Sequence, residues 1–297
     1  MKSHVLNLSD NTYPYLLRNI FDPPKKLNIS GNFPDFNLHP PLAVIGSRKP
    51  TEQGERMAFE LAGSLAMAGF TIVSGLAYGV DSIAHRGCLD KNGITVAVLG
   101  SGLEHIYPPI HKKLADEIAE KGGAVISEYE AKELPLQHHF PERNRIISGL
   151  SLGVVVVEAA IASGTLITAR SALEQGREVF AVPGLAGNVN TAGTHRLIRE
   201  GAALVESAQD IIDILSPRLS KEWNAKFSGQ SFGIGDKERR LLDLLGNKPK
   251  PVDLLIEESG LLPQDVLAAI TVLECSGLAA DKDGRGYIKN DKTTDHS

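Results

Sequence analysis

The sequence predicts an α/β protein with an extended Rossmann-like, doubly wound and mostly parallel sheet, followed by a small C-terminal winged-helix domain. Two observations predict the sheet. Short β-branched apolar runs alternate with longer amphipathic stretches, and the runs have the composition of strands buried on both faces. A third observation predicts the winged helix, because three helix-like stretches near the C-terminus precede a turn-rich segment flanked by strand-like residues.

The strands and helices of the larger domain follow in order along the chain. Strands are expected at Leu42–Gly46, Thr71–Ser74, Thr95–Leu99, Ala124–Ser127, Val154–Val157 and Glu178–Val182. Helices are expected at Glu52–Ala68, Val80–Asn92, His111–Lys121 and Leu166–Gln175. A last unit, Gly201–Leu215, closes the domain.

Four segments make up the predicted domain organisation. Residues 1–40 form an irregular extension, in which Tyr13–Phe21 could be a short helix ended by Asp22-Pro23-Pro24. Residues 41–215 form the Rossmann-like domain, and residues 216–235, which include Trp223, form a linker without periodicity. Residues 236–290 form the winged helix, with helices at Lys237–Leu245, Pro251–Ser259 and Pro263–Cys275 and a turn at Asp281–Gly286.

Composition limits the function classes. The 297 residues carry a net charge of −5, so overall charge gives no argument for nucleic-acid binding, and any DNA must bind a local basic patch. Met1–Asp10 lacks the apolar core of a signal peptide, and the apolar runs are too short to cross a membrane. We expect a cytoplasmic protein. The two cysteines, Cys88 and Cys275, predict neither a disulfide framework nor a zinc site.

The ends of the predicted strands, where parallel sheets bind their ligands, are rich in small residues. The candidate contact residues there are Gly46, Ser47, Arg48, Ser74, Gly75, Gly100, Ser101, Ser163, Gly164 and Thr165. Glycine allows close backbone approach to a ligand, and helix N-termini offer free N–H groups to phosphate. For any single loop, a tight turn explains the glycine equally well, but several such loops at one edge favour a binding crevice. We expect Arg48 to point into the crevice, because an arginine at a helix start opposes the helix dipole unless an anion offsets it.

The segment Phe140-Pro141-Glu142-Arg143-Asn144-Arg145 is the most specific feature of the sequence. It is expected to link the fourth strand to a short helix at Ile146–Leu150. Its two arginines and Asn144 offer hydrogen bonds to phosphate or base edges, and Phe140 could stack on an exposed base. The competing interpretation is that an arginine pairs with Glu158 and that Phe140 fills a core gap. We expect one arginine to be structural and the other to face the ligand.

At these residues the chain resembles the DprA/Smf family, the DNA-processing proteins of bacterial transformation. The resemblance covers about residues 13–215. It rests on Ala43–Arg48, Val73–Ala77, Ala97–Leu103, Phe140–Ser151, Glu158-Ala159, Ser163–Thr165, Thr168–Arg170 and Gly176–Gly184.

The resemblance implies a single-stranded DNA-binding protein that protects incoming DNA, forms a homodimer and loads the RecA recombinase. It also implies no enzymatic activity and no cofactor. The sequence departs from the family pattern at Tyr78, where a basic residue is frequent, and at Gln137, where some members carry a lysine. We therefore expect Gln137 to contact a DNA phosphate more weakly than a lysine would. We expect the sterile-alpha-motif-like domain of many members to be largely absent from this sequence, because only about 40 residues precede the first predicted strand.

Two other functions remain to be weighed. A nucleotide-processing enzyme of the lysine-decarboxylase-like phosphoribohydrolase type would need a catalytic glutamate soon after its Gly-Thr loop, and here none follows Thr165 until Glu174. Glu158 is the one well-placed carboxylate, and no base or nucleophile is evident beside it. A winged-helix transcription factor would need a basic recognition helix, whereas Pro263–Cys275 carries Asp265 and Glu274 and no Arg or Lys.

Overall fold

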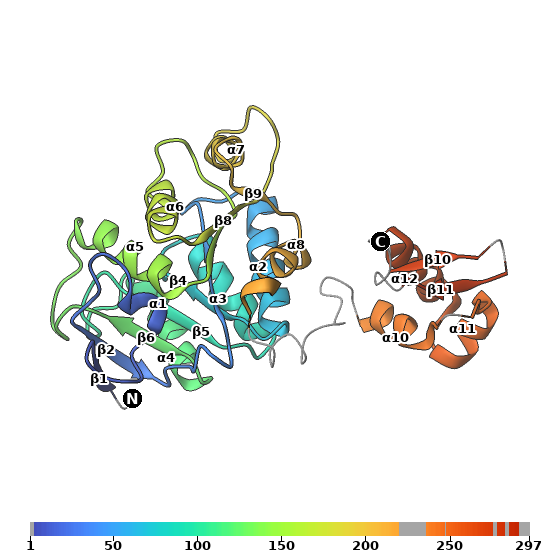
Figure 1. Ribbon diagram of the computed structural model, residues 1–297, viewed down its shortest axis with the longest axis horizontal. Helices are drawn as coiled ribbons and strands as arrows, with labels where there is room; N and C mark the ends of the chain where they lie inside the picture. Colours follow the sequence, from blue (N-terminus) through green and yellow to red (C-terminus); the bar gives the residue numbers. More distant parts are fainter. Residues whose placement is uncertain (1–2, 220–235, 247, 276–277, 283–284, 291–297) are drawn as a thin grey trace. The chain divides into compact units, whose positions relative to one another are not determined.

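The computed structural model describes residues 3–219, 236–246, 248–275, 278–282 and 285–290 (Figure 1). The chain divides into two compact units, residues 1–232 and 233–297. None of the helices in the described part of the chain is long and apolar enough to span a membrane.

The first unit is built on one nine-stranded sheet with the order β1-β2-β6-β5-β4-β3-β7-β8-β9. Seven strands are mutually parallel: β3 (Pro41–Ile45), β4 (Thr71–Ser74), β5 (Thr95–Val98), β6 (Ala124–Ser127), β7 (Gly153–Val156), β8 (Glu178–Ala181) and β9 (Ala203–Leu204). The chain moves outward from β3 to β6, then returns to place β7 beside β3. The strand order therefore reverses between β3 and β7, which is where open α/β sheets form a ligand-binding crevice. The predicted doubly wound, mostly parallel sheet is confirmed.

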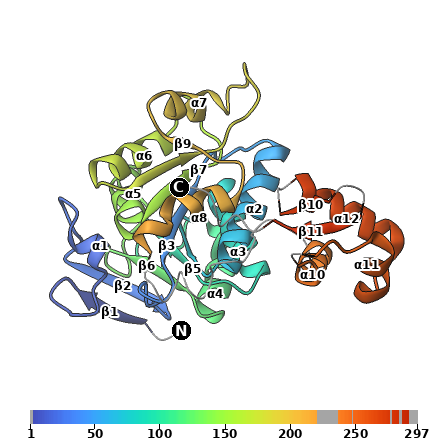
Figure 2. The same cartoon turned by 45° about the vertical axis from the view of Figure 1, so that its right-hand side comes forward.

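Helices cover both faces of this sheet (Figures 1 and 2). They are α1 (Tyr15–Arg18), α2 (Glu52–Met67), α3 (Val80–Asp90), α4 (Lys112–Glu120), α5 (His139–Leu150), α6 (Thr165–Glu174), α7 (Ala192–Arg199) and α8 (Ala208–Leu215). Two short 3₁₀ turns, η1 (Pro109–His111) and η2 (Ser216–Arg218), complete the unit. Alternate residues of one strand enter different cores: Val44 packs with α2, α3 and α8, while Ala43 and Ile45 pack with α1, α5 and α6. This alternation is why the strands are apolar throughout.

The expectation that residues 1–40 are irregular is wrong. β1 (Ser3–Asn7) and β2 (Lys26–Gly31) form an antiparallel hairpin, and β2 pairs antiparallel with β6 at the edge of the sheet. β2 alternates buried Leu27 and Ile29 with polar residues, which is the period-2 pattern of a strand with one covered face. This alternation is a weaker signal than the uniform apolar runs of the central strands, which is why the sequence did not predict β2 as a strand.

The boundaries at the end of the first unit also shift. Leu219 packs against the same core as Leu215, and Arg218 forms an ion pair with Glu178 at 2.6 Å, so the unit continues past the predicted closure at Leu215. Most of the predicted linker, residues 220–235 with Trp223, lies outside the described residues.

The second unit contains the predicted three helices and hairpin. These are α10 (Asp236–Leu244), α11 (Val252–Ser259), α12 (Pro263–Cys275), β10 (Ala279–Asp281) and β11 (Tyr287–Lys289). Its core includes Leu241, Leu255, Ile270 and Leu273. α11 ends at Gly260, whose φ of 63° is the left-handed conformation that glycine adopts without strain. Of the predicted turn at Asp281–Gly286, residues 283–284 lie outside the described residues.

Candidate nucleic-acid interface

Three side chains meet on the solvent side of the edge where the parallel strands end. The guanidinium carbon of exposed Arg48, in the loop between β3 and α2, lies 5.8 Å from the ring centre of Phe140. The ring of Tyr107, from the loop after β5, lies 5.5 Å from the Phe140 ring and is tilted by 51°. We call Arg48, Tyr107 and Phe140 the Arg48 cluster. It combines a fixed positive charge with two aromatic faces.

The backbone of β5 makes room for this cluster. An added Cβ at Gly100 would lie 3.0 Å from the Phe140 ring, tighter than ordinary side-chain contacts. The glycine after β5 therefore lets Phe140 settle onto the sheet edge, where it stays partly exposed. Phe140 itself sits in the first turn of α5, which begins at His139 and not at Ile146 as predicted.

Beneath the cluster, Arg143 is buried, with 3% of its surface exposed. Its guanidinium donates to the carbonyl oxygens of Gly75, at 2.8 Å, and of Val98, and its Nε donates to Asn144 Oδ1 at 3.2 Å. Burial lowers the pKa of Arg143 to about 10, although the nearby Asp81 carboxylate opposes this shift. The side chain therefore stays charged at neutral pH and ties the ends of β4 and β5 to α5.

Five predicted contact residues are buried in the structure: Ser74, Gly75, Gly100, Ser101 and Arg143. Gly75 gives its N–H to Asp81 Oδ2 at 3.1 Å, and a Cβ there would lie 2.7 Å from both Asp81 Oδ2 and an Arg143 nitrogen. Ser74 donates to the Val44 carbonyl at 2.7 Å, and Ser101 donates to the His105 carbonyl at 2.7 Å. These serines, Gly75 and Arg143 support the edge from below through internal hydrogen bonds.

Arg145 points to a different part of the molecule. It pairs with Glu128 Oε2 at 2.6 Å and with Asp22 at 3.3 Å, and its side chain is 21% exposed. The competing interpretation paired an arginine of this segment with Glu158, whereas Arg145 pairs with Glu128 and Asp22, and Arg143 donates to backbone carbonyls. Burial raises the pKa of the Glu128 carboxyl, and the charge of Arg145 opposes this rise. Both arginines of the segment thus make internal bonds, whereas Arg48 is exposed at this edge.

The remaining predicted residues lie at the surface or close to it. Gln137 is exposed just before α5. Gly164, which precedes α6, is exposed, and an added Cβ there would meet no atom within 4 Å. Ser163 accepts a hydrogen bond from the Thr165 N–H at 3.2 Å, and the Thr165 hydroxyl donates to the Gly46 carbonyl at 3.0 Å. The last bond connects the loop before α6 to the loop that carries Ser47 and Arg48.

Glu158, the carboxylate after β7, is 4% exposed and already engaged. The Thr51 N–H donates to it at 3.0 Å and the Thr51 hydroxyl at 2.5 Å. A carboxylate held this way beside a helix start is a poor general base or nucleophile. The phosphoribohydrolase interpretation is not favoured.

Sequence reasoning missed Tyr107. It lies outside the glycine loops, and a lone tyrosine near two prolines gives no periodic or motif signal. Tyr107 and Tyr78 are nevertheless 43% and 48% exposed at this edge, which is unusual for large aromatic side chains. Their exposure, visible in the structure, is the signal that marks them.

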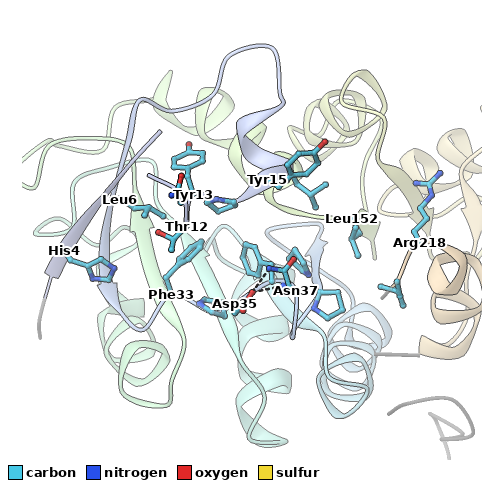
Figure 3. A pocket seen from close by; sticks show the side chains of 18 residues that line it. His4, Leu6, Thr12, Tyr13, Tyr15, Phe33, Asp35, Asn37, Leu152 and Arg218 are labelled. Atoms are coloured by element: carbon cyan, nitrogen blue, oxygen red, sulfur yellow. Dashed lines mark hydrogen bonds between the residues drawn. The ribbon is translucent and has the colours of Figure 1, made fainter. Parts of the chain in front are cut away.

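A large hollow of the first unit lies at the opposite end of the strands (Figure 3). It has a volume of about 870 Å³ and is lined by the N-terminal segment, including Tyr13, Phe33 and Phe36, and by Pro41 and Leu152 at the starts of β3 and β7. None of the predicted contact residues lines it. Two of its polar residues bond to each other, as the Asp35–Asn37 hydrogen bonds in Figure 3 show.

With this geometry established, comparison with known proteins is informative. Residues 4–216 match the family model of DNA recombination-mediator protein A, and residues 232–285 match the DprA winged helix domain. Protein Smf of Escherichia coli strain K12 is 42% identical over 293 residues, which cover 96% of this chain and 77% of that protein.

Two solved structures are similar to the first unit. The X-ray structure of DNA processing protein A from Streptococcus pneumoniae aligns with a TM-score of 0.67 and 43% identity, over 71% of this chain and 74% of that chain. DNA processing protein A from Helicobacter pylori, whose structure addresses its single-stranded DNA binding mode, aligns with a TM-score of 0.66 and 32% identity, over 74% and 98% of the two chains. The resemblance found in the motifs is confirmed, and the chain belongs to the DNA recombination-mediator protein A family of DNA-processing proteins, the DprA/Smf family.

Proposed function

We propose that this protein binds single-stranded DNA at the edge formed by the Arg48 cluster and the glycine loops around it. The observation that carries the proposal is the exposed Arg48 guanidinium held over the partly exposed ring of Phe140, with Tyr107 beside it. A guanidinium neutralises a phosphate, and a ring or guanidinium plane stacks on a base. The cluster therefore offers both interactions that an unpaired nucleotide needs.

The exposed guanidinium and rings at the edge favour a single strand over a duplex. In a duplex the base faces are stacked on one another and cannot reach a side-chain ring, whereas in a single strand each base can turn outward. Arg48 covers Phe140 in the free protein, so an incoming base would either stack on the guanidinium or displace it. The single-stranded DNA binding described for the Helicobacter pylori relative supports this assignment.

The finer parts of the proposal rest on the family. The protein would form a homodimer, protect incoming DNA and load the RecA recombinase without catalysing a reaction, as a cytoplasmic protein. Loading predicts faster RecA filament growth on oligonucleotides coated with single-strand-binding protein. Unchanged growth would remove this part of the proposal and leave DNA binding intact.

One assay tests the core of the proposal. Fluorescence anisotropy with labelled oligo-dT and with a duplex of equal length should show at least about tenfold tighter binding of the single strand. Nucleoside monophosphate hydrolysis is followed in parallel and should stay at background. Equal affinity for the two DNAs would contradict the proposal, and hydrolysis would return the enzyme interpretation.

A further inference from the structure

The start of α2 lies at the place where Rossmann-like folds take a nucleotide phosphate. It follows the first parallel strand, β3, beside the point where the strand order reverses. Helix starts attract anions because their first N–H groups are unpaired and the helix dipole is positive there. Here the anion is supplied by the protein, since the buried Glu158 carboxylate accepts from the backbone N–H and the hydroxyl of Thr51, the N-cap of α2.

The packing around this carboxylate leaves no place for a second anion. An added Cβ at Gly54, the third residue of α2, would lie 2.5 Å from the carboxyl carbon of Glu158. The adjoining hollow, lined in part by Thr51, Glu158 and Gly184, has a volume of about 30 Å³. This is about the room of one water molecule and too small for a phosphate ester.

The same carboxylate fixes one end of the loop that carries Arg48. Thr51 is the residue at which this loop enters α2. The middle of the loop is held at the Lys49 carbonyl by Asn190 Nδ2, at 3.1 Å, and its start at the Gly46 carbonyl by the Thr165 hydroxyl. Arg48 is the exposed residue between these fixed points.

We propose that Glu158 is a resident anion that replaces a nucleotide phosphate at the start of α2 and positions the Arg48 loop for the DNA backbone. This proposal rests on the proposed function, because it concerns the same interface. It makes Glu158 a positioning residue that does not touch DNA. It also directs DNA phosphates to Arg48 and away from the N-terminus of α2, where the carboxylate would repel them.

The proposal makes a prediction whose sign is unusual. If Glu158 acted only through its charge, replacing it with a neutral residue at a DNA-binding edge would strengthen DNA binding, because a like charge would be removed. A positioning role predicts weaker binding. In Glu158→Gln, the amide nitrogen can only donate, so the bond with the Thr51 hydroxyl must reverse its direction and the negative charge that strengthens both Thr51 bonds is lost.

The experiment compares four variants with the wild type by oligo-dT anisotropy, at a temperature where each is fully folded by circular dichroism. Glu158→Gln should weaken binding by about tenfold. Glu52→Gln is the matched control, since it removes an exposed carboxylate from the first turn of the same helix, and it should bind as well as the wild type or more tightly. Gly54→Ala keeps Glu158 but intrudes on its carboxylate, so it should also weaken binding, although alanine alone favours a helix.

Arg48→Ala separates the two proposals. If the wild type does not bind oligo-dT, the proposed function fails. If Arg48→Ala weakens binding while Glu158→Gln and Gly54→Ala bind like the wild type, the resident-anion proposal is overturned and the proposed function stands. Hydrogen exchange of residues 46–53 in DNA-free protein gives a second readout that also serves if Glu158→Gln binds poorly for reasons of folding. Faster exchange in Gly54→Ala, confined to this loop, is expected, and unchanged exchange would overturn the positioning role.

Discussion

The edge where the parallel strands end has an exposed outer layer, the Arg48 cluster, and a buried inner layer around Arg143. Both layers contain an arginine, but the two arginines have different surroundings. Arg48, in the outer layer, is exposed, and its guanidinium lies over the ring of Phe140. Arg143, in the inner layer, is buried and donates to backbone carbonyls at the ends of two strands. The difference shows that an arginine in a family motif can serve mainly to hold strands and helix together. We expect the exposed layer to govern DNA binding and the buried layer to govern stability.

The largest effect is expected for Arg143→Ala. The substitution leaves the Gly75 and Val98 carbonyls and the Asp81 carboxylate without their buried cationic neighbour. Breaking a buried charged network typically costs about 3–5 kcal/mol. Urea unfolding followed by circular dichroism should show a loss of this size. A variant that is as stable as the wild type but cannot bind DNA would instead place Arg143 in the outer layer.

Arg48→Ala should show the reverse pattern. The melting temperature should stay within about 2 °C of the wild type, because an exposed side chain is lost. Affinity for oligo-dT should fall by about 1–3 kcal/mol for all sequences alike, with a flatter salt dependence. Lys49→Ala, the neighbouring exposed cation, is the control for unspecific charge. If it weakens binding as much as Arg48→Ala, the guanidinium over Phe140 has no special role.

We expect a pH-dependent loss of stability from a buried histidine in the core of the first unit. His85, on α3, is fully buried, and its Nδ1 lies 2.7 Å from Thr95 Oγ1, which donates to the Ile72 carbonyl. The Thr95 oxygen must therefore accept from Nδ1–H, which places a proton on Nδ1, and burial of the ring favours its neutral form. Burial lowers the pKa of His85 to about 3, with a further contribution from the charges of His111 and Arg143.

The sign follows from the unfolded state. The unfolded chain protonates His85 near pH 6.5 and the folded chain does not, so stability is full above this pH and falls below it. Between pH 7 and pH 5 the wild type should lose about 2 kcal/mol more than His85→Gln, which donates to Thr95 but does not titrate. Urea titrations of both proteins at the two pH values measure this difference. Equal losses would show that His85 is protonated in the folded protein.

The sequence predicted the sheet well because its central strands are apolar throughout and its helices are amphipathic. It failed at β1 and β2, where strands of mixed polarity at the sheet edge resemble a loop, and at the start of α5, which begins at His139 and holds Pro141 in its first turn, a position that a helix tolerates.

For the interface, the sequence identified the correct loops but not the direction of their side chains. Whether Arg48 or Arg143 faces solvent depends on how α5 lies over β4 and β5, which no local pattern specifies. Glu158 was recognised as well placed, but its partner, Thr51, is 107 residues away in the chain. Tyr107 had no signal at all. In each case the missing information was a long-range contact.

The smallest effect on DNA binding is expected from the winged-helix unit. The exposed residues of α12 include Gln264, Leu267, Ala268, Thr271, Val272 and Glu274, and none of them is basic. DNA-reading helices need basic residues to neutralise phosphates, so this face suits a protein partner better than DNA. Deleting residues 233–297 removes the second compact unit and keeps Leu219 and the Arg218–Glu178 pair, which a cut at Leu215 would lose. The truncated protein should therefore fold and bind oligo-dT within about 1 kcal/mol of the full chain. Anisotropy and a melting curve for both lengths provide the measurement. A loss above about 2 kcal/mol in a well-folded truncation would make the winged helix a principal DNA-binding element, and the Arg48 cluster would then be only part of the interface.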